Sequence, residues 1–360
     1  MATDLMDPPP AATGGWPMEP PAPVPSPINP PPGPSIGGAM DALNHPSVGA
    51  PERHASDVET SPRGVARWRD ALALSKPRIV TMILVTTVCT GIIGAGGGVS
   101  WVSMAWLLVG TGLVAAAAGA ANQIWERRID QHMGRTASRP LPSGRMRAAE
   151  AMVWMAAALA IGTGVLAWRF GVVPAAVGVA TWALYLFVYT PMKTRTTINT
   201  AVGAVAGALP VLIGYTATGG GFGDWAGWLL LAVLAAWQFP HFMAIAWMYR
   251  DQYAEAGFRM TPSVHRDGWS AAVQAIVGAA ALMAASVGLV AMVTGWGDVW
   301  SIGYLVLGSI LVVAASWPML AASIRFYRDR NDATARRLLR SSLWVLPAVL
   351  AVATAGVFVR

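Results

Sequence analysis

Three oxygen-bearing side chains follow one another at helical spacing, directly after an uncharged segment. Asn122, Glu126 and Asp130 are four residues apart, and the segment 101–121 before them carries no charge. On a helix, residues i, i+4 and i+8 share one face. Two carboxylates and an amide oxygen on one stripe suit Mg²⁺, which takes one or two protein carboxylates and completes its shell with water and substrate phosphate. The alternative is a polar helix end whose acids pair only with nearby cations, but unneeded carboxylates are costly in an apolar setting.

Basic residues indicate what such a site would bind. Arg135 and Arg139 follow the acidic residues, and Lys193 and Arg195 lie in the next loop expected on the same side of a membrane. Guanidinium and ammonium groups form charge-assisted hydrogen bonds with phosphate oxygens. These four residues are therefore candidates for neutralising the charge of a diphosphate.

A second acidic pair follows later in the chain. Asp251 and Glu255 are again spaced i, i+4, directly after the apolar segment 224–248. Repeated halves around one shared site recur in membrane proteins. Two acidic helix ends at one membrane surface therefore favour metal-dependent diphosphate chemistry in a cavity between them.

The elements that position these residues are expected to be membrane-spanning helices. Of the 360 residues, 55% are hydrophobic and 12% are charged, about half the charge of a soluble domain. A spanning helix needs about 20 apolar residues. Nine segments qualify, at 79–97, 101–121, 150–168, 171–190, 199–218, 224–248, 270–293, 300–324 and 341–358. We therefore predict an all-α polytopic membrane protein, with nine transmembrane helices around a central cavity that opens to the cytoplasmic side.

The distribution of positive charge predicts the orientation of these helices. Of the 25 Lys and Arg residues, all except Arg169 and Arg360 precede the first span or lie in loops on one side. The positive-inside rule places the N-terminus and these loops in the cytoplasm. It also explains the net charge of +7 without a nucleic-acid partner. We expect a multi-pass protein of the bacterial plasma (inner) membrane, surrounded by membrane lipid, with its chemistry at the cytoplasmic side.

The first part of the chain has a different composition. Residues 1–65 contain 16 of the 26 prolines, and such a segment favours polyproline II and cannot bury a core. We predict a disordered Pro-rich cytoplasmic tail over 1–65 and a nine-helix membrane domain over 66–360. The single cysteine, Cys89, lies within an apolar segment and permits no internal disulfide.

Four longer motifs resemble one protein family. They read "LSKPRIV" at 74–80, "NQIWERRIDQHMGRTASRPLPSG" at 122–144, "YTPMKTRTTINTAVGAVAGALPVLIGY" at 189–215 and "WQFPHFMAIAWMYRDQYAEAG" at 237–257. These stretches are similar to the UbiA-type intramembrane prenyltransferases and, within them, to the heme O synthase (protoheme IX farnesyltransferase) branch. The "RPLPSG" and "WQFPHF" runs are more specific to this branch than the acidic spacing, which the whole superfamily shares.

The resemblance implies a reaction. A farnesyl group would pass from farnesyl diphosphate to a vinyl group of protoheme IX (heme B), giving heme O for the biogenesis of heme–copper oxidases. Mg²⁺ and basic residues would stabilise the departing diphosphate, and the allylic cation would need a dry pocket with aromatic faces. Water would trap the cation formed on the vinyl group. The implied partners are farnesyl diphosphate, heme B and a heme A synthase that takes up heme O.

The resemblance also assigns residues. Asn122 and Asp130 match the first acidic motif of the family, and Glu126 replaces its middle Asp. At the second motif, Gln252 stands where the family has Asp, so Asp251, one residue earlier, becomes the candidate. The implied catalytic residues and metal ligands are Asn122, Glu126, Asp130 and Asp251, and the implied diphosphate-binding residues are Arg135, Arg139, Lys193, Arg195 and Asn199.

Two histidines are candidates for contacting heme iron, which accepts imidazole. His241 follows Pro240 inside the segment 224–248, and His132 lies in an Arg-rich loop. A Pro–His pair within a span can equally satisfy freed backbone carbonyls.

Two other functions stay open. One is a prenyltransferase of the same fold that acts on an aromatic acid or quinone precursor. The other is a secondary transporter that uses its acidic residues for ion coupling. A transporter should carry ionisable groups near the middle of its spans, and His241 is almost the only such group here.

Overall fold

The computed structural model describes residues 63–359. The Pro-rich tail predicted over 1–65 lies almost entirely outside the described residues. Within them, the chain forms helices joined by loops and turns, the longest at 131–147, and contains no strand. The helices are α1 (Arg63–Leu74), α2 (Pro77–Gly94), α3 (Trp101–Asp130), α4 (Ala148–Phe170), α5 (Val172–Ala183), η1 (Leu184–Tyr189), α6 (Thr190–Met192), α7 (Asn199–Ala208), α8 (Pro210–Ala217), α9 (Trp225–Met248), α10 (Arg250–Glu255), α11 (Thr261–Val264), α12 (Trp269–Thr294), α13 (Val299–Arg328) and α14 (Asp332–Gly356).

The nine predicted spans are confirmed for the described part of the chain, which has nine helices long and apolar enough to cross a membrane. The fourth span is the continuous run α5–η1–α6, and the fifth is α7 followed by α8. Two spans extend farthest beyond their predicted bounds, because α3 continues to Asp130 and α14 already begins at Asp332. The additional turns are polar and extend beyond the apolar segments. The acidic residues at 122–130 are thus the last turns of a spanning helix.

Two spans are irregular in their backbone. In the fifth, α7 gives way to α8 at Pro210, because proline has no N–H to donate to the carbonyl four residues earlier. In the fourth, η1 is a π-helical turn, a feature that is frequent at functional sites. Tyr185 and Tyr189 lie on this turn and line the cavity described below.

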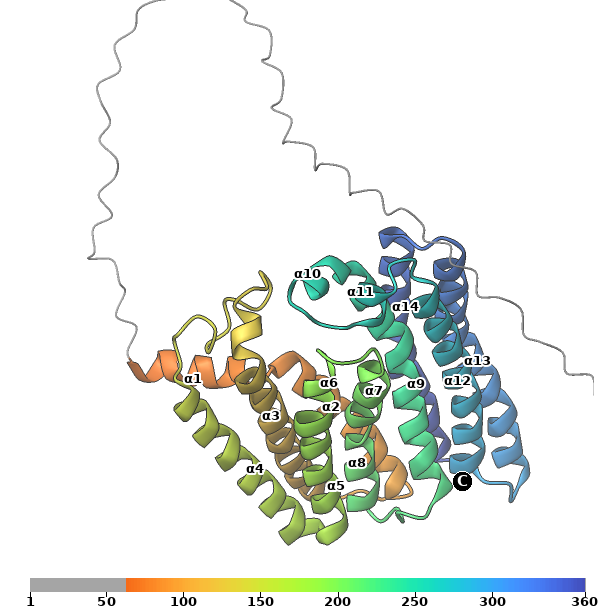
Figure 1. Ribbon diagram of the computed structural model, residues 1–360. Helices are drawn as coiled ribbons and strands as arrows, with labels where there is room; N and C mark the ends of the chain where they lie inside the picture. Colours follow the sequence, from red (N-terminus) through yellow and green to blue (C-terminus); the bar gives the residue numbers. More distant parts are fainter. Residues whose placement is uncertain (1–62, 360) are drawn as a thin grey trace, which may run out of the picture. The chain divides into compact units, whose positions relative to one another are not determined.

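The spans pack closely through small residues. α12 lies against α9, α13 and α14, and α3 lies against α4 (Figure 1). At Gly110 and Gly162, where α3 meets α4, an added Cβ would lie 2.8 Å from side-chain atoms of Leu166 and Leu113. Glycine at these contacts lets the two backbones approach, as is usual for helices in membranes.

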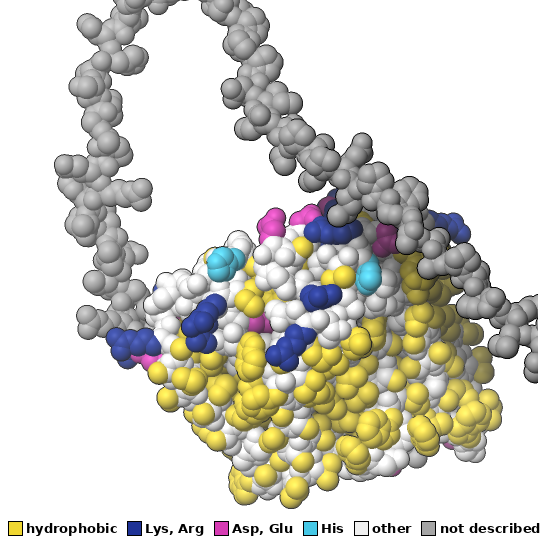
Figure 2. Space-filling model, in the orientation of Figure 1, with side chains coloured by type: hydrophobic (Ala, Val, Ile, Leu, Met, Phe, Trp, Pro, Cys, Tyr) yellow, Lys and Arg dark blue, Asp and Glu magenta, His cyan; other side chains and the backbone are white. Residues whose placement is uncertain are grey.

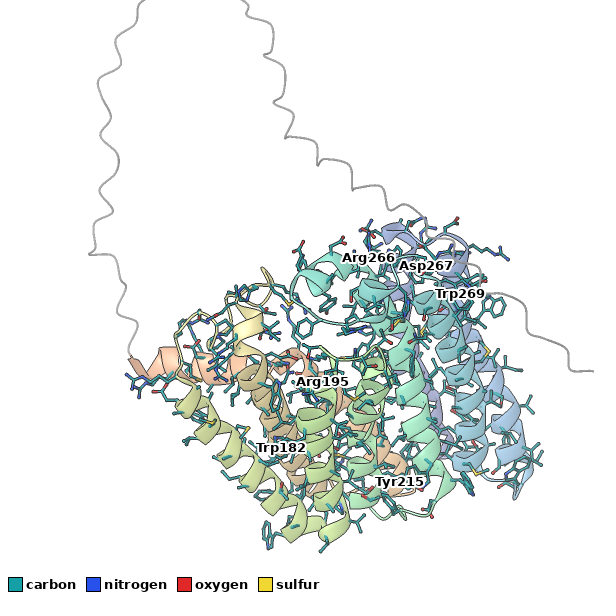
Figure 3. All side chains as sticks on the ribbon, in the orientation of Figure 1. Trp182, Arg195, Tyr215, Arg266, Asp267 and Trp269 are labelled. Atoms are coloured by element: carbon teal, nitrogen blue, oxygen red, sulfur yellow. The ribbon has the colours of Figure 1, made fainter. Side chains whose placement is uncertain are left out.

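The surface separates an apolar flank from a charged end. Figure 2 shows hydrophobic side chains over most of the flank, and Lys and Arg gathered towards the end that carries α10 and α11. Large side chains such as Trp168 and Trp344 are 70% and 80% exposed on the apolar surface. Figure 3 places Arg266 and Asp267 at the charged end and Tyr215 near the opposite end. The exposed apolar flank is the surface that lipid would cover.

Candidate active site

A cavity of about 590 Å³ lies between α2, α3, η1, α7 and α9. Its lining is mostly apolar and aromatic, but charged and amide side chains converge on one part of it. These are Lys76, Asn122, Glu126, Asp130, Arg139 and Lys193. A few converging polar groups in a largely apolar cavity are typical of a small-molecule site.

The end of α3 positions three of these residues. Asn122, Glu126 and Asp130, here called the acidic stripe, all line the cavity and are 1%, 4% and 2% exposed. They lie on one face because each is four residues from the next on a regular helix. A buried carboxylate is stable only when it is paired with a cation or bound to a metal. The acidic stripe therefore requires charged partners.

Two of these partners come from the loops that follow α3 and α6. The Lys193 Nζ atom lies 2.7 Å from Glu126 Oε1, and the Arg139 Nη1 atom lies 2.6 Å from Asp130 Oδ2. Both carboxylates are thus neutralised by residues that the sequence predicts for diphosphate binding. The same cations can serve either a carboxylate or a phosphate, since both present oxygen acceptors.

The third partner, Lys76, was not among the candidate residues. Its Nζ donates to Asn122 Oδ1 at 2.5 Å, and the Asn122 amide donates to Thr190 Oγ1 at 3.3 Å. Lys76 has φ 56° and ψ 62°, and it is the only residue other than glycine with positive φ among residues 63–359. This conformation costs roughly 1–2 kcal/mol, and such strain is often kept at functional sites. The signal in the sequence was a lysine directly before Pro77, at the start of the first span.

The pKa values of Lys76 and Lys193 are shifted in opposite directions. Burial, together with the nearby charge of Lys193, lowers the pKa of Lys76 to about 7. Burial alone would also lower the pKa of Lys193, but attraction to Glu126 and to Tyr189 raises it above its ordinary value. Lys193 therefore keeps its charge at neutral pH, whereas the pKa of Lys76 lies far below that of an ordinary lysine.

Aromatic rings surround Lys193. Its ammonium lies 4.7 Å from the ring centroid of Tyr189 and 5.9 Å from that of Phe258. The rings of Tyr185 and Tyr189 lie 5.1 Å apart. The negative faces of such rings stabilise positive charge in an apolar setting. This part of the cavity can therefore stabilise a second cation that forms beside the rings.

Arg135 also lines the cavity and is itself exposed. Its guanidinium lies 5.3 Å from the ring centroid of Tyr249, and its Nη2 donates to Tyr253 Oη at 3.5 Å. Arg135 thus connects the loop after α3 to the break between α9 and α10. This position suits a residue that holds the outer part of an anionic ligand.

The second acidic pair does not reach the cavity. The chain breaks between α9 and α10, so the acidic residues do not continue the spanning helix as the sequence suggests. The Asp251 side chain is 66% exposed and pairs with Arg266. Gln252 and Glu255 are also exposed, and none of the three acidic or amide residues lines the cavity.

Two further candidates for diphosphate binding, Arg195 and Asn199, do not line the cavity. Arg195 is exposed on the loop between α6 and α7 and does not line the cavity (Figure 3). Asn199 is buried, and its amide donates to the carbonyls of Thr196 at 2.5 Å and Arg259 at 2.9 Å. The Arg259 N–H in turn donates to the Lys193 carbonyl at 2.6 Å. Asn199 therefore holds together the two loops that position Lys193.

The two histidines lie in different environments. His241 lines the cavity from α9, its ring stacks on Trp237 at 4.7 Å, and its Nδ1 lies 2.9 Å from Ser342 Oγ on α14. The hydrogen bond at Nδ1 leaves Nε2 available to a ligand. His132 is exposed, lies outside the cavity lining and has Nδ1 3.0 Å from the Arg128 carbonyl.

The acidic stripe fits Mg²⁺ in the chemistry of its donors. Its two carboxylates and one amide supply oxygen ligands, and phosphate and water oxygens usually complete such a site. Within residues 63–359, no three His, Cys, Asp or Glu side chains cluster closely enough to hold a metal by themselves. Because Lys193 and Arg139 now neutralise the carboxylates, metal and diphosphate would enter together.

The chain is similar in sequence to enzymes of known type. Residues 83–355 match the model of the UbiA prenyltransferase family. A protoheme IX farnesyltransferase of Rhodopirellula baltica is 54% identical over 79% of this chain and 98% of its own length. A mitochondrial protoheme IX farnesyltransferase of Arabidopsis thaliana is 36% identical over 77% of this chain and 62% of its own.

The fold also matches solved structures. A UbiA homolog from Archaeoglobus fulgidus bound to GPP and Mg²⁺ aligns with a TM-score of 0.57 at 16% identity, over 79% of this chain and 99% of the homolog. A digeranylgeranylglyceryl phosphate synthase aligns with a TM-score of 0.61 at 14% identity, over 81% and 98%. These likenesses establish the helical architecture, and the family match extends over most of the sequence. The chain belongs to the UbiA prenyltransferase family.

Proposed function

We propose that the protein transfers the farnesyl group of farnesyl diphosphate to a vinyl group of protoheme IX (heme B), giving heme O. The observation that carries this proposal is the 54% identity to a protoheme IX farnesyltransferase over 98% of that relative's length. The cavity is compatible with this chemistry because it joins a charged part, suited to diphosphate, to an apolar part, suited to two lipophilic substrates.

The diphosphate binds where the cations meet the acidic stripe. Lys193 and Arg139 exchange their carboxylate partners for phosphate oxygens, and Arg135 approaches from the exposed side. The acidic stripe is then free to hold Mg²⁺, which when bound neutralises the charge of the departing diphosphate. Asp251 would reach the diphosphate only if α10 turned towards the cavity.

The transfer needs a stabilised allylic cation. The bond between C1 of the farnesyl group and the diphosphate oxygen breaks, and the electron pair leaves with diphosphate. Tyr185 and Tyr189 present aromatic rings beside Lys193, where C1 would lie. C1 then bonds to the terminal vinyl carbon of heme, which leaves a cation on the carbon next to the porphyrin. Water adds to that carbon and loses a proton, giving the hydroxyl group of heme O.

The heme iron binds near the middle of α9 in this scheme. His241 Nε2 is the group that would contact the iron, because Ser342 and Trp237 hold the ring from its other sides. Replacing His241 by Ala should weaken heme retention and leave the affinity for farnesyl diphosphate unchanged. Equal heme retention in the two proteins would assign His241 to packing against α14.

The charged end of the protein faces the cytoplasm in our proposal, in a bacterial inner membrane. The support is the concentration of Lys and Arg at that end, which Figure 2 shows on one face. The heme O produced would pass to a heme A synthase. A reporter that is active only in the cytoplasm, fused after Arg360, should be inactive, and an active reporter would reverse this orientation.

Expression in a bacterium that lacks heme O tests the proposed reaction. Hemes extracted from the membranes should include one whose mass exceeds that of heme B by a farnesyl group and a hydroxyl group. The Asp130→Ala variant, expressed to the same membrane level, should produce none of it. A wild-type culture with no new heme, but with a prenylated aromatic acid, would assign the protein to a different acceptor.

A further inference from the structure

We infer that Gln238 holds the water molecule that becomes the hydroxyl group of the product. The inference rests on the proposed function, since it concerns the last step of that reaction. Gln238 lies on α9, lines the cavity and is 5% exposed. It takes no part in the binding of diphosphate described above, so its orientation calls for a separate explanation.

The amide group of Gln238 has a defined orientation. Its Nε2 donates to the Ala204 carbonyl on α7 at 2.8 Å and to the Leu234 carbonyl on α9 at 3.4 Å. Both amide hydrogens therefore have acceptors. A flipped amide would point its oxygen at two carbonyl oxygens, which is unfavourable. The hydrogen bonds thus fix Nε2 towards the backbone and Oε1 away from it.

The Oε1 atom is an unused acceptor at the cavity wall. In the part of the chain that the structure describes, no group donates a hydrogen bond to it. It lies against Gly207, where an added Cβ would be 2.4 Å away. Gly207 also lines the cavity. The absence of a side chain at position 207 therefore makes the space that this oxygen occupies.

A second acceptor lies next to Gly207. Pro210 has no N–H, so the Ala206 carbonyl lacks its usual helical donor four residues later. Ala206 and Pro210 both line the same cavity. A buried water needs two or more polar partners, and the Gln238 Oε1 atom together with the freed carbonyl supplies two acceptors. A water that donates both hydrogens to them keeps its lone pairs for an electron-poor carbon.

The depth of Gln238 agrees with this role. At Gly203, an added Cβ would lie 2.5 Å from the ring of Tyr189, and that ring lies 4.7 Å from Lys193 Nζ. Gly207 is one helical turn farther along α7, roughly 6 Å deeper. Gln238 therefore lies just beyond the aromatic rings at which the allylic cation forms. This is the depth at which the vinyl group must meet C1.

The water oxygen forms a bond to the cationic carbon next to the porphyrin, and the oxonium that results then loses one proton, whose final acceptor is the released diphosphate. Gln238 is neutral, and its Oε1 accepts a hydrogen bond from the water but does not take up a proton. It therefore acts as a positioning residue and not as a base. Without a held water, the same cation loses a proton from the adjacent carbon and becomes an alkene. The two products differ by one water.

The alternative role for Gln238 is structural, because its amide joins α9 to α7. A structural role predicts that replacement lowers the stability and the total turnover but leaves the product ratio unchanged. Positioning of water predicts a change in the ratio itself. The ratio of hydroxylated to dehydrated heme is therefore the decisive measurement.

The experiment uses the full-length protein with heme B and farnesyl diphosphate in ¹⁸O-labelled water. Wild type should give mainly hydroxylated heme that carries the label. Gln238→Leu should shift the product ratio towards the alkene by about tenfold, the effect expected from loss of one hydrogen bond. Gly207→Ala should shift it in the same direction, because the new Cβ displaces Oε1. Phe239→Leu, which alters the neighbouring contact of α9 with α12, should leave it unchanged.

The outcomes separate the inference from the proposed function. An unchanged product ratio in both Gln238→Leu and Gly207→Ala would overturn the inference, whatever their total activity. If Gln238→Leu does not accumulate in membranes, Gly207→Ala alone decides. Failure of wild type to form any prenylated heme would instead reject the proposed function.

Discussion

Replacing Lys193 by Met should destabilise the protein strongly, because it would leave the Glu126 carboxylate buried without its nearest cation. The two charged atoms lie 2.7 Å apart, and their side chains are 11% and 6% exposed. Removing one partner of a buried ion pair costs about 3–5 kcal/mol. We expect a cost at the lower end, ~3 kcal/mol, since neither side chain is completely buried.

The double variant Lys193→Met with Glu126→Gln should recover most of this loss. Both members of the pair are then uncharged, so neither leaves a buried charge without its partner. The coupling free energy between the two positions should therefore be about 2 kcal/mol or more. A matched control is Arg266→Met, whose ion pair with Asp251 is exposed on both sides. That control should change stability by less than about 1 kcal/mol.

The assay is reversible unfolding of the purified protein in mixed micelles, with helical content followed by circular dichroism. The five proteins are wild type, Lys193→Met, Glu126→Gln, the double variant and the Arg266→Met control, because the coupling free energy needs both single variants. Two results would refute the reasoning. One is a cost for Lys193→Met no larger than for Arg266→Met, and the other is a double variant less stable than Lys193→Met alone.

Further substitutions address other parts of the site. Lys76→Gly should be about 1 kcal/mol more stable than Lys76→Ala, since glycine accepts φ 56° without strain; equal melting temperatures would remove the case for backbone strain. Asn122→Ala and Asp130→Ala should each abolish heme O formation at saturating Mg²⁺, whereas Glu126→Asp should keep much of this activity. An active Asp130→Ala enzyme would mean that the acidic stripe has a structural role only. Deletion of residues 2–60 should leave activity within a few-fold, because a Pro-rich segment buries no core; loss of activity at normal membrane levels would assign the tail a role in catalysis or docking.

The spans and the acidic stripe are predictable because their signals are local. An apolar segment of sufficient length must form a helix in lipid, because only then are its backbone N–H and C=O groups hydrogen-bonded. The nine segments of this kind agree with the helices observed in residues 63–359. Spacing of four residues on one helix likewise places Asn122, Glu126 and Asp130 on one face without any tertiary information.

The remaining features depend on contacts between distant parts of the chain. Lys76 reaches Asn122 from 46 positions earlier, through a left-handed residue that no pattern of hydropathy marks. Asp251 was expected to continue a spanning helix, but the chain breaks after α9, so the side chain points to solvent. The orientation of Gln238 depends on an acceptor on α7 and on the glycine beside it. None of these contacts follows from the spacing of residues along one helix.

The most direct test of the proposed function is a competition between acceptors in one reaction. Purified full-length protein in lipid nanodiscs is incubated with farnesyl diphosphate, Mg²⁺, heme B and 4-hydroxybenzoate. The products are separated and identified by mass spectrometry. We expect heme B to gain a farnesyl group and a hydroxyl group, with 4-hydroxybenzoate recovered unchanged. Prenylated 4-hydroxybenzoate, with no heme at the mass of heme O, would contradict the proposal.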